Sequence, residues 1–351
     1  MPISCSARSL ARAGRRAAEP CTRHARAPRR SAVQALLALV VSILLSPSGA
    51  TAGESARKLD LERRLAGPDG TVMVVAHRAC WKGTSENSLD AIRACIAAGI
   101  DMVELDVRAT RDGKLVLMHD AGVERMTEGS GKVSDLDWAE LRKLHLREGK
   151  GQRDGKPTPL TRRRIPTFAQ ALRVAKDRIL INVDAKAPLS PSVLAMIDAA
   201  GGREQVLFKA EAPLEQVREA APWVRSVRFM PILREPYMKA DPAAFIGAYD
   251  PIRPVGYEID IKDRGFAPIL TPLIRTRCAR YWVDSLAGRA FSDVEALTDP
   301  QGVWGRLVAI GVDAIQTDEP LLLKAYLRQT GQRGFACPPG QAPRALLSAH
   351  R

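Results

Sequence analysis

Two carboxylates, Glu104 and Asp106, lie two residues apart in the apolar run 102–107. Residues two apart in an extended strand point to the same face, so the two side chains would be neighbours. Neighbouring carboxylates repel each other and raise the pKa of at least one of them, unless a cation lies between them. The pair therefore predicts a bound cation.

Polar side chains also follow other apolar runs of the chain. His77 and Arg78 follow the first run, His119 follows a short extended piece, and Asp184 and Lys186 end a later run. Carboxylates without cysteine suit a hard divalent cation, Ca²⁺ or Mg²⁺, rather than Zn²⁺. Such a cation, together with Arg and Lys, suits an anionic substrate and above all a phosphate ester, while two histidines can serve as acid and base near neutral pH.

Each of these residues alone has a structural interpretation, as a hydrogen-bonded loop histidine or as half of a salt bridge. Their joint occurrence at run ends favours a catalytic site. Four further carboxylates end later runs, namely Glu258, Asp260, Asp284 and Asp318.

The elements that must position these residues alternate regularly. Apolar runs predict strands at 71–76, 101–107, 178–184, 205–209, 226–231, 256–261, 280–285 and 313–317. Helical patterns follow them at 88–98, 135–144, 167–176, 191–200, 213–221, 241–249, 268–279, between 292 and 310, and at 320–329. Nearly continuous apolar strands are typical of a parallel sheet that is buried on both faces.

Eight such units indicate an α/β protein with one (β/α)8 TIM-barrel domain over residues 71–330. The active site of such a barrel lies at the carboxyl ends of its strands, where the polar residues gather. A doubly wound open sheet is the alternative, but no glycine-rich phosphate loop follows the first strand. Residues 53–70 are a polar lead-in with one helical turn around 58–65, 114–118 are extended, 145–164 form a loop, and 331–351 form an irregular tail.

The first 52 residues have the layout of a cleavable signal peptide. Residues 1–31 contain eight Arg, no Lys and one acidic residue; an apolar stretch at 35–45 and the sequence Ala50-Thr51-Ala52 follow. The apolar stretch is too short to span a bilayer. We expect cleavage after Ala52 and a periplasmic or secreted protein, exported by the Sec route or, through Arg29-Arg30, by the twin-arginine route. The alternative is a disordered basic leader or a start codon placed too early.

The net charge is +14, of which residues 53–351 contribute +7. A modestly basic surface could steer an anionic substrate or contact an anionic membrane, although nothing requires membrane contact. The basic loop 147–164 suggests surface association on charge alone. Basic and aromatic residues do not interleave, so nucleic acid is not an expected partner. Four cysteines follow the leader, and export would allow the pairs Cys80–Cys95 and Cys278–Cys337.

Several segments resemble the glycerophosphodiester phosphodiesterase family. They are His77-Arg78, 85–88 (SENS), 104–107 (ELDV), 110–113 (TRDG), His119-Asp120, 127–131 (TEGSG), 165–167 (IPT) and 311–318 (GVDAIQTD). The resemblance covers about residues 72–328, and these segments are specific in combination. The resemblance implies a (β/α)8 barrel that hydrolyses glycerophosphodiesters to sn-glycerol 3-phosphate and an alcohol.

The resemblance also implies a role for each matching residue. Glu104, Asp106 and Asp184 would hold the divalent cation, Ca²⁺ or Mg²⁺, and His77 and His119 would be the acid–base pair. Arg78 and Lys186 would contact the phosphate, with support from Glu86 and Asn87. A glycerol hydroxyl would attack phosphorus, the alcohol would leave, and water would open the cyclic product.

The chain departs from the family pattern at several positions. Ala79 replaces a glycine, Ser85 and Ser88 flank Glu86-Asn87, Asp184 replaces a glutamate, and 282–285 (WVDS) replaces a Trp-Thr-Val-Asn segment. Two other functions stay open. One is a phospholipase-D-like enzyme on lysophospholipids or sphingolipids, with Trp81 or 229–236 as its apolar rim; the other is a non-catalytic exported barrel that binds phosphoesters.

Overall fold

The computed structural model describes residues 52–186 and 191–338. The predicted leader, except for Ala52, lies outside the described residues, as does 339–351 of the predicted tail. Within the described part of the chain, no helix has both the length and the apolar character needed to cross a bilayer.

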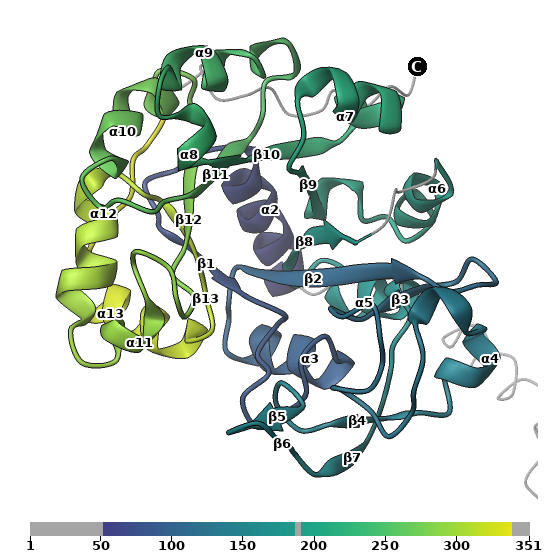
Figure 1. Ribbon diagram of the computed structural model, residues 1–351. Coiled ribbons are helices and arrows are strands. Elements are labelled where there is room, and N and C mark those ends of the chain that lie inside the picture. The colour runs from purple at the N-terminus through teal and green to yellow at the C-terminus, as the bar shows by residue number, and fades with distance from the viewer. Residues whose placement is uncertain (1–51, 187–190, 339–351) are drawn as a thin grey trace, which may run out of the picture. The chain divides into compact units, whose positions relative to one another are not determined.

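Eight parallel strands close into a barrel, as the sequence predicts (Figure 1). They are β1 (Met73–Ala76), β2 (Met102–Ala109), β8 (Leu180–Ala185), β9 (Val206–Ala210), β10 (Arg228–Arg234), β11 (Gly256–Asp260), β12 (Arg280–Asp284) and β13 (Ala314–Thr317). Each strand pairs with its neighbour in chain order, and β1 pairs with both β2 and β13. This closure excludes the open doubly wound sheet. The short strand β3 (Leu115–Leu117) runs antiparallel to the end of β2.

Helices follow the strands and form the outer layer. They are α3 (Leu89–Ala97), α4 (Trp138–Leu141), α5 (Phe168–Ala175), α6 (Pro191–Ala199), α7 (Leu214–Ala220), α8 (Glu235–Met238), α9 (Pro242–Gly247), α10 (Ala267–Arg275), α11 (Asp293–Ala296), α12 (Arg306–Ile310) and α13 (Pro320–Thr330). Ser88 caps α3 by accepting a hydrogen bond from the Ala91 amide, and a Thr167–Gln170 capping box begins α5. Both starts agree with the sequence-based boundaries within about a residue.

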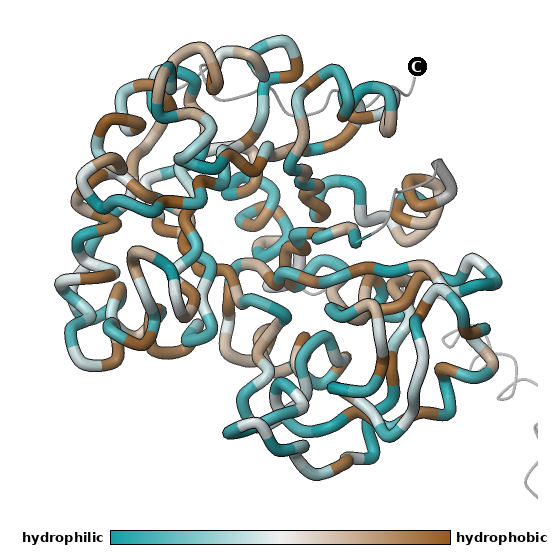
Figure 2. Tube along the Cα trace, viewed as in Figure 1, coloured by the Kyte–Doolittle hydropathy of each residue, from teal (hydrophilic) through white to brown (hydrophobic). Residues whose placement is uncertain are grey.

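The amino-terminal end of the barrel is filled by the helix α2 (Ala52–Ala66) (Figure 1). The sequence predicts only one turn there, but the helix has 15 residues because its apolar side can be buried. Leu61 and Leu65 are buried against a layer of interior side chains from the strand starts, including Met73 and Met102. In the hydropathy trace, hydrophobic and hydrophilic residues alternate along α2, inside the ring of strands (Figure 2). Substrate can therefore enter only from the opposite, carboxyl end.

The predicted loop 145–164 contains two small antiparallel sheets, which corrects the sequence interpretation. The strand β4 (His145–Arg147) pairs with β7 (Leu160–Arg164), and β5 (Gln152–Arg153) pairs with β6 (Lys156–Pro157). These strands are two to five residues long and mostly solvent-exposed. They therefore lack the apolar alternation that marks a strand in sequence. We refer to residues 142–164 as the basic ribbons.

Both predicted disulfides are present. Cys80–Cys95 joins the β1–α3 segment to α3, with 5.3 Å between the Cα atoms, and Cys278–Cys337 ties residue 337 to the start of β12, with 5.4 Å. Residues 331–338 contain no helix and no strand longer than a single bridge. The second disulfide therefore fixes a segment that has little regular structure of its own.

The Cys80–Cys95 bond should stabilise the segment that carries His77 and Arg78. A disulfide that closes a loop of 15 residues contributes about 3 kcal/mol, mainly by restricting the unfolded chain. We expect the double variant Cys80→Ser/Cys95→Ser to lose about 2–4 kcal/mol of unfolding free energy in urea denaturation. A change within the error of the extrapolation would show that the bond contributes nothing.

Candidate active site

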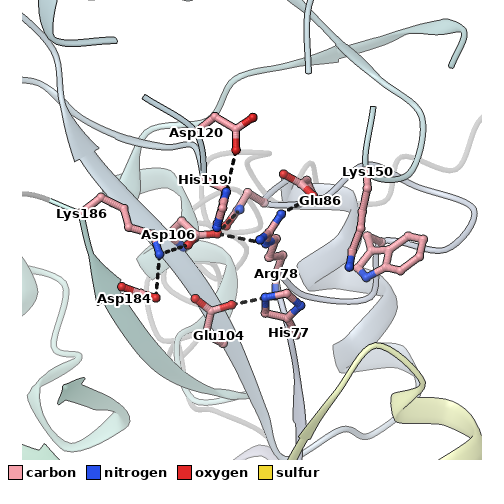
Figure 3. A network of polar contacts seen from close by, with 12 residues as sticks. His77, Arg78, Glu86, Glu104, Asp106, His119, Asp120, Lys150, Asp184 and Lys186 are labelled. Atoms are coloured by element: carbon pink, nitrogen blue, oxygen red, sulfur yellow. Dashed lines mark hydrogen bonds and ion pairs between the residues drawn. The ribbon is translucent and has the colours of Figure 1, made fainter. Parts of the chain in front are cut away.

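A cavity of about 770 Å³ opens at the carboxyl ends of the strands. Seven of the predicted site residues line it. His77 and Arg78 follow β1, and Glu104 and Asp106 lie on β2. His119 lies shortly after β3, Asp184 lies on β8, and Lys186 follows β8. The two remaining predicted residues, Glu86 and Asn87, are buried directly behind Arg78 and Asp106. The fold thus brings together all nine residues, and Figure 3 labels all of them except Asn87.

Three carboxylates form the floor of the site. One oxygen each of Glu104, Asp106 and Asp184 lies within 4.8 Å of the others, as the parallel register of β2 and β8 requires. Burial and the nearby Asp106 raise the pKa of Glu104 well above its usual value. Burial would also raise the pKa of Asp106, but Lys186 and Arg78 outweigh it and lower that pKa. The ionised form of Glu104 would therefore gain from a cation beside it.

Two further residues adjoin this triad: Lys209, which the sequence analysis missed, and Glu258, which it named only as a carboxylate at a strand end. Lys209 is buried on β9, with its Nζ 3.2 Å from Glu258 and 4.0 Å from Asp184. Burial lowers the pKa of Lys209, but Glu258, Glu104 and Asp184 outweigh this and raise it, so the ammonium stays charged. The signal for Lys209 in the sequence was a lysine at an inward position of an otherwise apolar strand.

The donor set fits a divalent cation. When all are ionised, five carboxylates (Glu104, Asp106, Asp184, Glu258 and Glu86) face three cations (Lys186, Lys209 and Arg78), which leaves an excess of two negative charges. Clustered carboxylate oxygens without cysteine are the ligands that Ca²⁺ and Mg²⁺ prefer. One such ion would neutralise the excess.

Arg78 is fixed from three sides. Its guanidinium donates to Glu86 at 3.0 Å and lies 3.6 Å from Asp106, and its backbone amide donates to Glu104 at 2.9 Å. The Asn87 side-chain amide donates to the Asp106 carboxylate, and the Asp106 backbone amide donates to Asn87 Oδ1. Glu86 and Asn87 therefore orient the residues that face the cavity.

His119 is held by a chain of ion pairs. Its Nδ1 lies 2.6 Å from Asp120, whose carboxylate also accepts from Arg125. Arg125 continues to Glu86 at 2.6 Å and so connects the His119 and Arg78 networks. Burial would raise the pKa of Asp120, but Arg125 and His119 outweigh it and lower the pKa to about 2. Because the ionised carboxylate accepts at Nδ1, Nε2 is the nitrogen left for a ligand.

His77, which follows β1, is likewise held by a carboxylate, that of Asp318 at the end of β13. Its Nδ1 lies 2.9 Å from Asp318 Oδ1, which also accepts from the Trp81 indole at 3.0 Å. The other oxygen of Asp318 accepts from Lys150 at 2.6 Å, and the Lys150 ammonium lies 4.9 Å from the centre of the Trp81 ring. The sequence identified Asp318 only as a strand end and Trp81 only as a rim candidate, and it missed Lys150.

Asp318 and Lys150 should shift the pH profile in opposite directions. Burial lowers the pKa of His77, Asp318 raises it, and Lys150 lowers it. Asp318→Asn should therefore move the limb of the kcat/KM profile that His77 controls to lower pH and reduce kcat by roughly 10–100-fold, because the ring loses its orienting partner. Lys150→Met should move the same limb to higher pH. Superimposable pH–rate profiles would show that neither residue acts on His77.

Two departures from the family pattern can now be located. Ala79 replaces a glycine at φ +63°, where a Cβ costs about 1–2 kcal/mol, yet the residue is accommodated and buried. Asp184 is one methylene shorter than glutamate, yet its carboxylate still reaches the other two. Phe229, in the predicted apolar rim, lines the cavity, whereas Trp81 lies beneath Lys82 and Lys150.

Together, the fold and the site define a (β/α)8-barrel protein with two oriented histidines around a carboxylate triad. Residues 77–200 match the glycerophosphoryl diester phosphodiesterase family, and residues 229–327 match a domain of unknown function. The glycerophosphodiester phosphodiesterase of Caldanaerobacter subterraneus is 35% identical over 115 residues, 32% of this chain and 45% of the relative. YhdW of Bacillus subtilis is 28% identical over 251 residues, 70% of this chain and 94% of its own length.

Solved structures agree in fold. A glycerophosphoryl diester phosphodiesterase from Parabacteroides distasonis superposes with a TM-score of 0.61 at 20% identity, covering 82% of this chain and 94% of that one. A phosphodiesterase from Oleispira antarctica, solved with sn-glycerol-3-phosphate, gives 0.52 at 19% identity, covering 73% and 96%. Over residues 77–200, the chain is therefore similar to the glycerophosphodiester phosphodiesterase family. It spans less than half the length of the first curated relatives that it matches.

Proposed function

We propose that the protein hydrolyses glycerophosphodiesters to sn-glycerol 3-phosphate and an alcohol with the help of a divalent cation. The observation that carries this proposal is the placement of His77 and His119, each oriented by a carboxylate, beside the triad in one cavity. A relative with the same fold was solved with sn-glycerol-3-phosphate, which is the product expected here.

The position of each cavity residue suggests its role in binding the cation or the phosphate. Glu104, Asp106 and Asp184 would hold Ca²⁺ or Mg²⁺, which supplies positive charge to the phosphate oxygens. Arg78 and Lys186 face the same cavity and would bind the remaining phosphate oxygens. Both side chains are already held by carboxylates, so they need little reorganisation when the phosphate arrives.

The two histidines would move the protons. One accepts the proton of a glycerol hydroxyl as its oxygen bonds to phosphorus, and the other donates a proton to the alcohol oxygen as its bond to phosphorus breaks. Water then opens the cyclic phosphate with the two roles reversed. Burial lowers the pKa of His77, which makes its neutral form abundant at neutral pH.

Chelation tests the metal role. EDTA should abolish glycerophosphocholine turnover, and Ca²⁺ or Mg²⁺ should restore it, as measured by released choline and sn-glycerol 3-phosphate. A panel of glycerophosphodiesters assayed in the same way would identify the preferred headgroup. Full activity in excess EDTA would remove the metal role, and absence of turnover for every diester and lysolipid with either metal would favour a phosphoester-binding barrel.

A second candidate function has its own support in the cavity. Beyond Lys209, the cavity continues along an apolar lining that includes Phe208, Val217, Trp223, Val224 and Phe229. A phosphodiester at one end and a hydrocarbon chain at the other would match a lysophospholipid. Ala221 also lines the cavity, so Ala221→Trp should reduce kcat/KM for lysophosphatidylcholine and leave kcat/KM for glycerophosphocholine unaffected. If kcat/KM for lysophosphatidylcholine is the same in this variant as in the wild type, the small diesters remain the preferred class.

We also propose that the protein is exported and cleaved after Ala52, to the periplasm or the medium. The two disulfides support this location, because such bonds persist in oxidising compartments. Mass spectrometry of the secreted or periplasmic fraction should find Gly53 as the first residue. Recovery of the uncleaved chain from the cytosol would contradict the proposal.

A further inference from the structure

The basic ribbons carry an unusual share of the charge of this chain. Residues 142–164 contain nine Arg or Lys and two acidic residues, Glu148 and Asp154, a net charge of +7. Residues 53–351 contain 45 basic and 38 acidic residues, which is also +7. Outside the basic ribbons, the positive and negative charges of residues 53–351 therefore cancel.

Only part of this charge is used internally. Lys150 pairs with Asp318, Arg163 pairs with Asp90 at 3.0 Å, and Arg147 donates to the carbonyls of Thr127 and Thr158. Arg164 donates to the carbonyl of Lys143. The remaining five side chains are exposed and have neither a carboxylate nor a hydrogen-bond partner among residues 52–186 and 191–338: Arg142, Lys143, Arg153, Lys156 and Arg162. Exposed cations without counterions are available to an external anion.

The five cations are distributed over both small sheets rather than converging on one point. Arg153 and Lys156 lie on the β5–β6 pair, Arg162 lies on β7, and Arg142 and Lys143 follow α4. One groove of about 590 Å³ beside them is lined by five arginines and Trp138, with Asp90 as its only carboxylate. A spread of single charges matches a layer of separate anions better than it matches one compact ligand.

An apolar side chain accompanies these charges. In β7, Leu160 is 45% exposed and shares the outer face of the strand with Arg162 and Arg164. A leucine beside basic residues can enter the boundary between headgroups and acyl chains while the cations stay with the phosphates. Nucleic acid would instead require stacking aromatics, and of these the groove offers only Trp138.

We propose that the basic ribbons dock the protein on a bilayer that contains anionic phospholipid. The ribbons are fastened to the candidate active site, because Gly149 pairs with Thr84 and Glu86 through backbone hydrogen bonds and Lys150 reaches Asp318. Docking would therefore hold the cavity next to the membrane surface. The inference concerns binding alone and does not depend on the proposed hydrolysis.

Vesicle co-sedimentation of the purified chain tests this docking. Vesicles of phosphatidylcholine and phosphatidylglycerol in equal parts should bind the protein at low salt, and binding should weaken steeply as salt rises. Vesicles of phosphatidylcholine alone should bind weakly. Each basic residue near an anionic surface strengthens binding by roughly fivefold, so Arg153→Gln/Lys156→Gln/Arg162→Gln should lower the partition coefficient by about a hundredfold.

The control removes three exposed arginines from helices or turns elsewhere, in the variant Arg225→Gln/Arg306→Gln/Arg328→Gln. It makes the same change in net charge and should stay within about threefold of the wild-type partition coefficient. Equal losses in the two variants would show a response to net charge only and overturn the proposal. So would equal binding to neutral and anionic vesicles, or binding to heparin or DNA without binding to vesicles.

Discussion

Replacing His119 by alanine is expected to lower kcat for glycerophosphocholine by roughly 10²–10⁴-fold, and His77→Ala by a similar factor. Each ring lines the cavity and has its Nδ1 engaged by a carboxylate, so Nε2 is positioned for proton transfer. Alanine removes this nitrogen without adding bulk. The loss should appear in kcat more than in KM, because proton transfer occurs in the transition state.

His145 provides a matched control for the two histidines. It hydrogen-bonds to Glu128 at 2.8 Å on the basic ribbons and does not line the cavity. His145→Ala should therefore retain near-wild-type kcat. Circular dichroism and thermal unfolding would establish that all three variants fold. Near-wild-type turnover in either His77→Ala or His119→Ala would rule out the acid–base assignment of that residue.

Asp106→Asn should remove both bound metal and activity. Asp106 is held in place by three side chains: Lys186 lies 3.0 Å from its carboxylate, Asn87 donates to it at 2.7 Å, and Arg78 lies 3.6 Å away. An amide cannot neutralise a divalent cation, and it leaves Lys186 with one carboxylate fewer. We expect turnover to fall by at least about 10³-fold, as for the loss of a principal electrostatic group.

Metal stoichiometry separates this effect from misfolding. Isothermal titration should show one Ca²⁺ or Mg²⁺ site in the wild type, and binding should be lost or strongly weakened in Asp106→Asn. Asp154→Asn removes an exposed carboxylate from the β5–β6 turn and should change neither quantity. Unchanged metal affinity in Asp106→Asn would exclude this residue as a ligand, whatever its effect on turnover.

The pKa shifts also predict how stability depends on pH. Burial raises the pKa of Asp318, but His77 and Lys150 outweigh it and lower the pKa below that of an unfolded aspartate. A lowered carboxylate pKa stabilises the fold above the unfolded pKa, and this contribution is lost as pH falls through the folded value. Asp120, whose pKa falls to about 2, acts in the same direction. Urea unfolding should therefore show stability decreasing from about pH 4 towards pH 2.

The sequence by itself determined the strand order and most of the candidate site. Period-two spacing placed Glu104 and Asp106 on one face of a strand. Buried parallel strands can be recognised in the sequence because each is a continuous apolar run. Polar residues at the ends of such runs must meet, since the carboxyl ends of parallel strands share one side of the barrel. For this reason the nine predicted residues lie together.

The tertiary structure alone decided which side chains orient the site. Lys150 lies 168 positions before Asp318, and Arg125 lies 39 positions after Glu86, so no local pattern links these partners. The long α2 and the basic ribbons were also misjudged. The helix α2 is stabilised by packing against the barrel interior, which comes from distant parts of the chain. The strands of the basic ribbons are too short and too exposed to give a periodic apolar pattern. Sequence spacing thus identified the reacting groups, whereas the packing of distant segments determined their orientation.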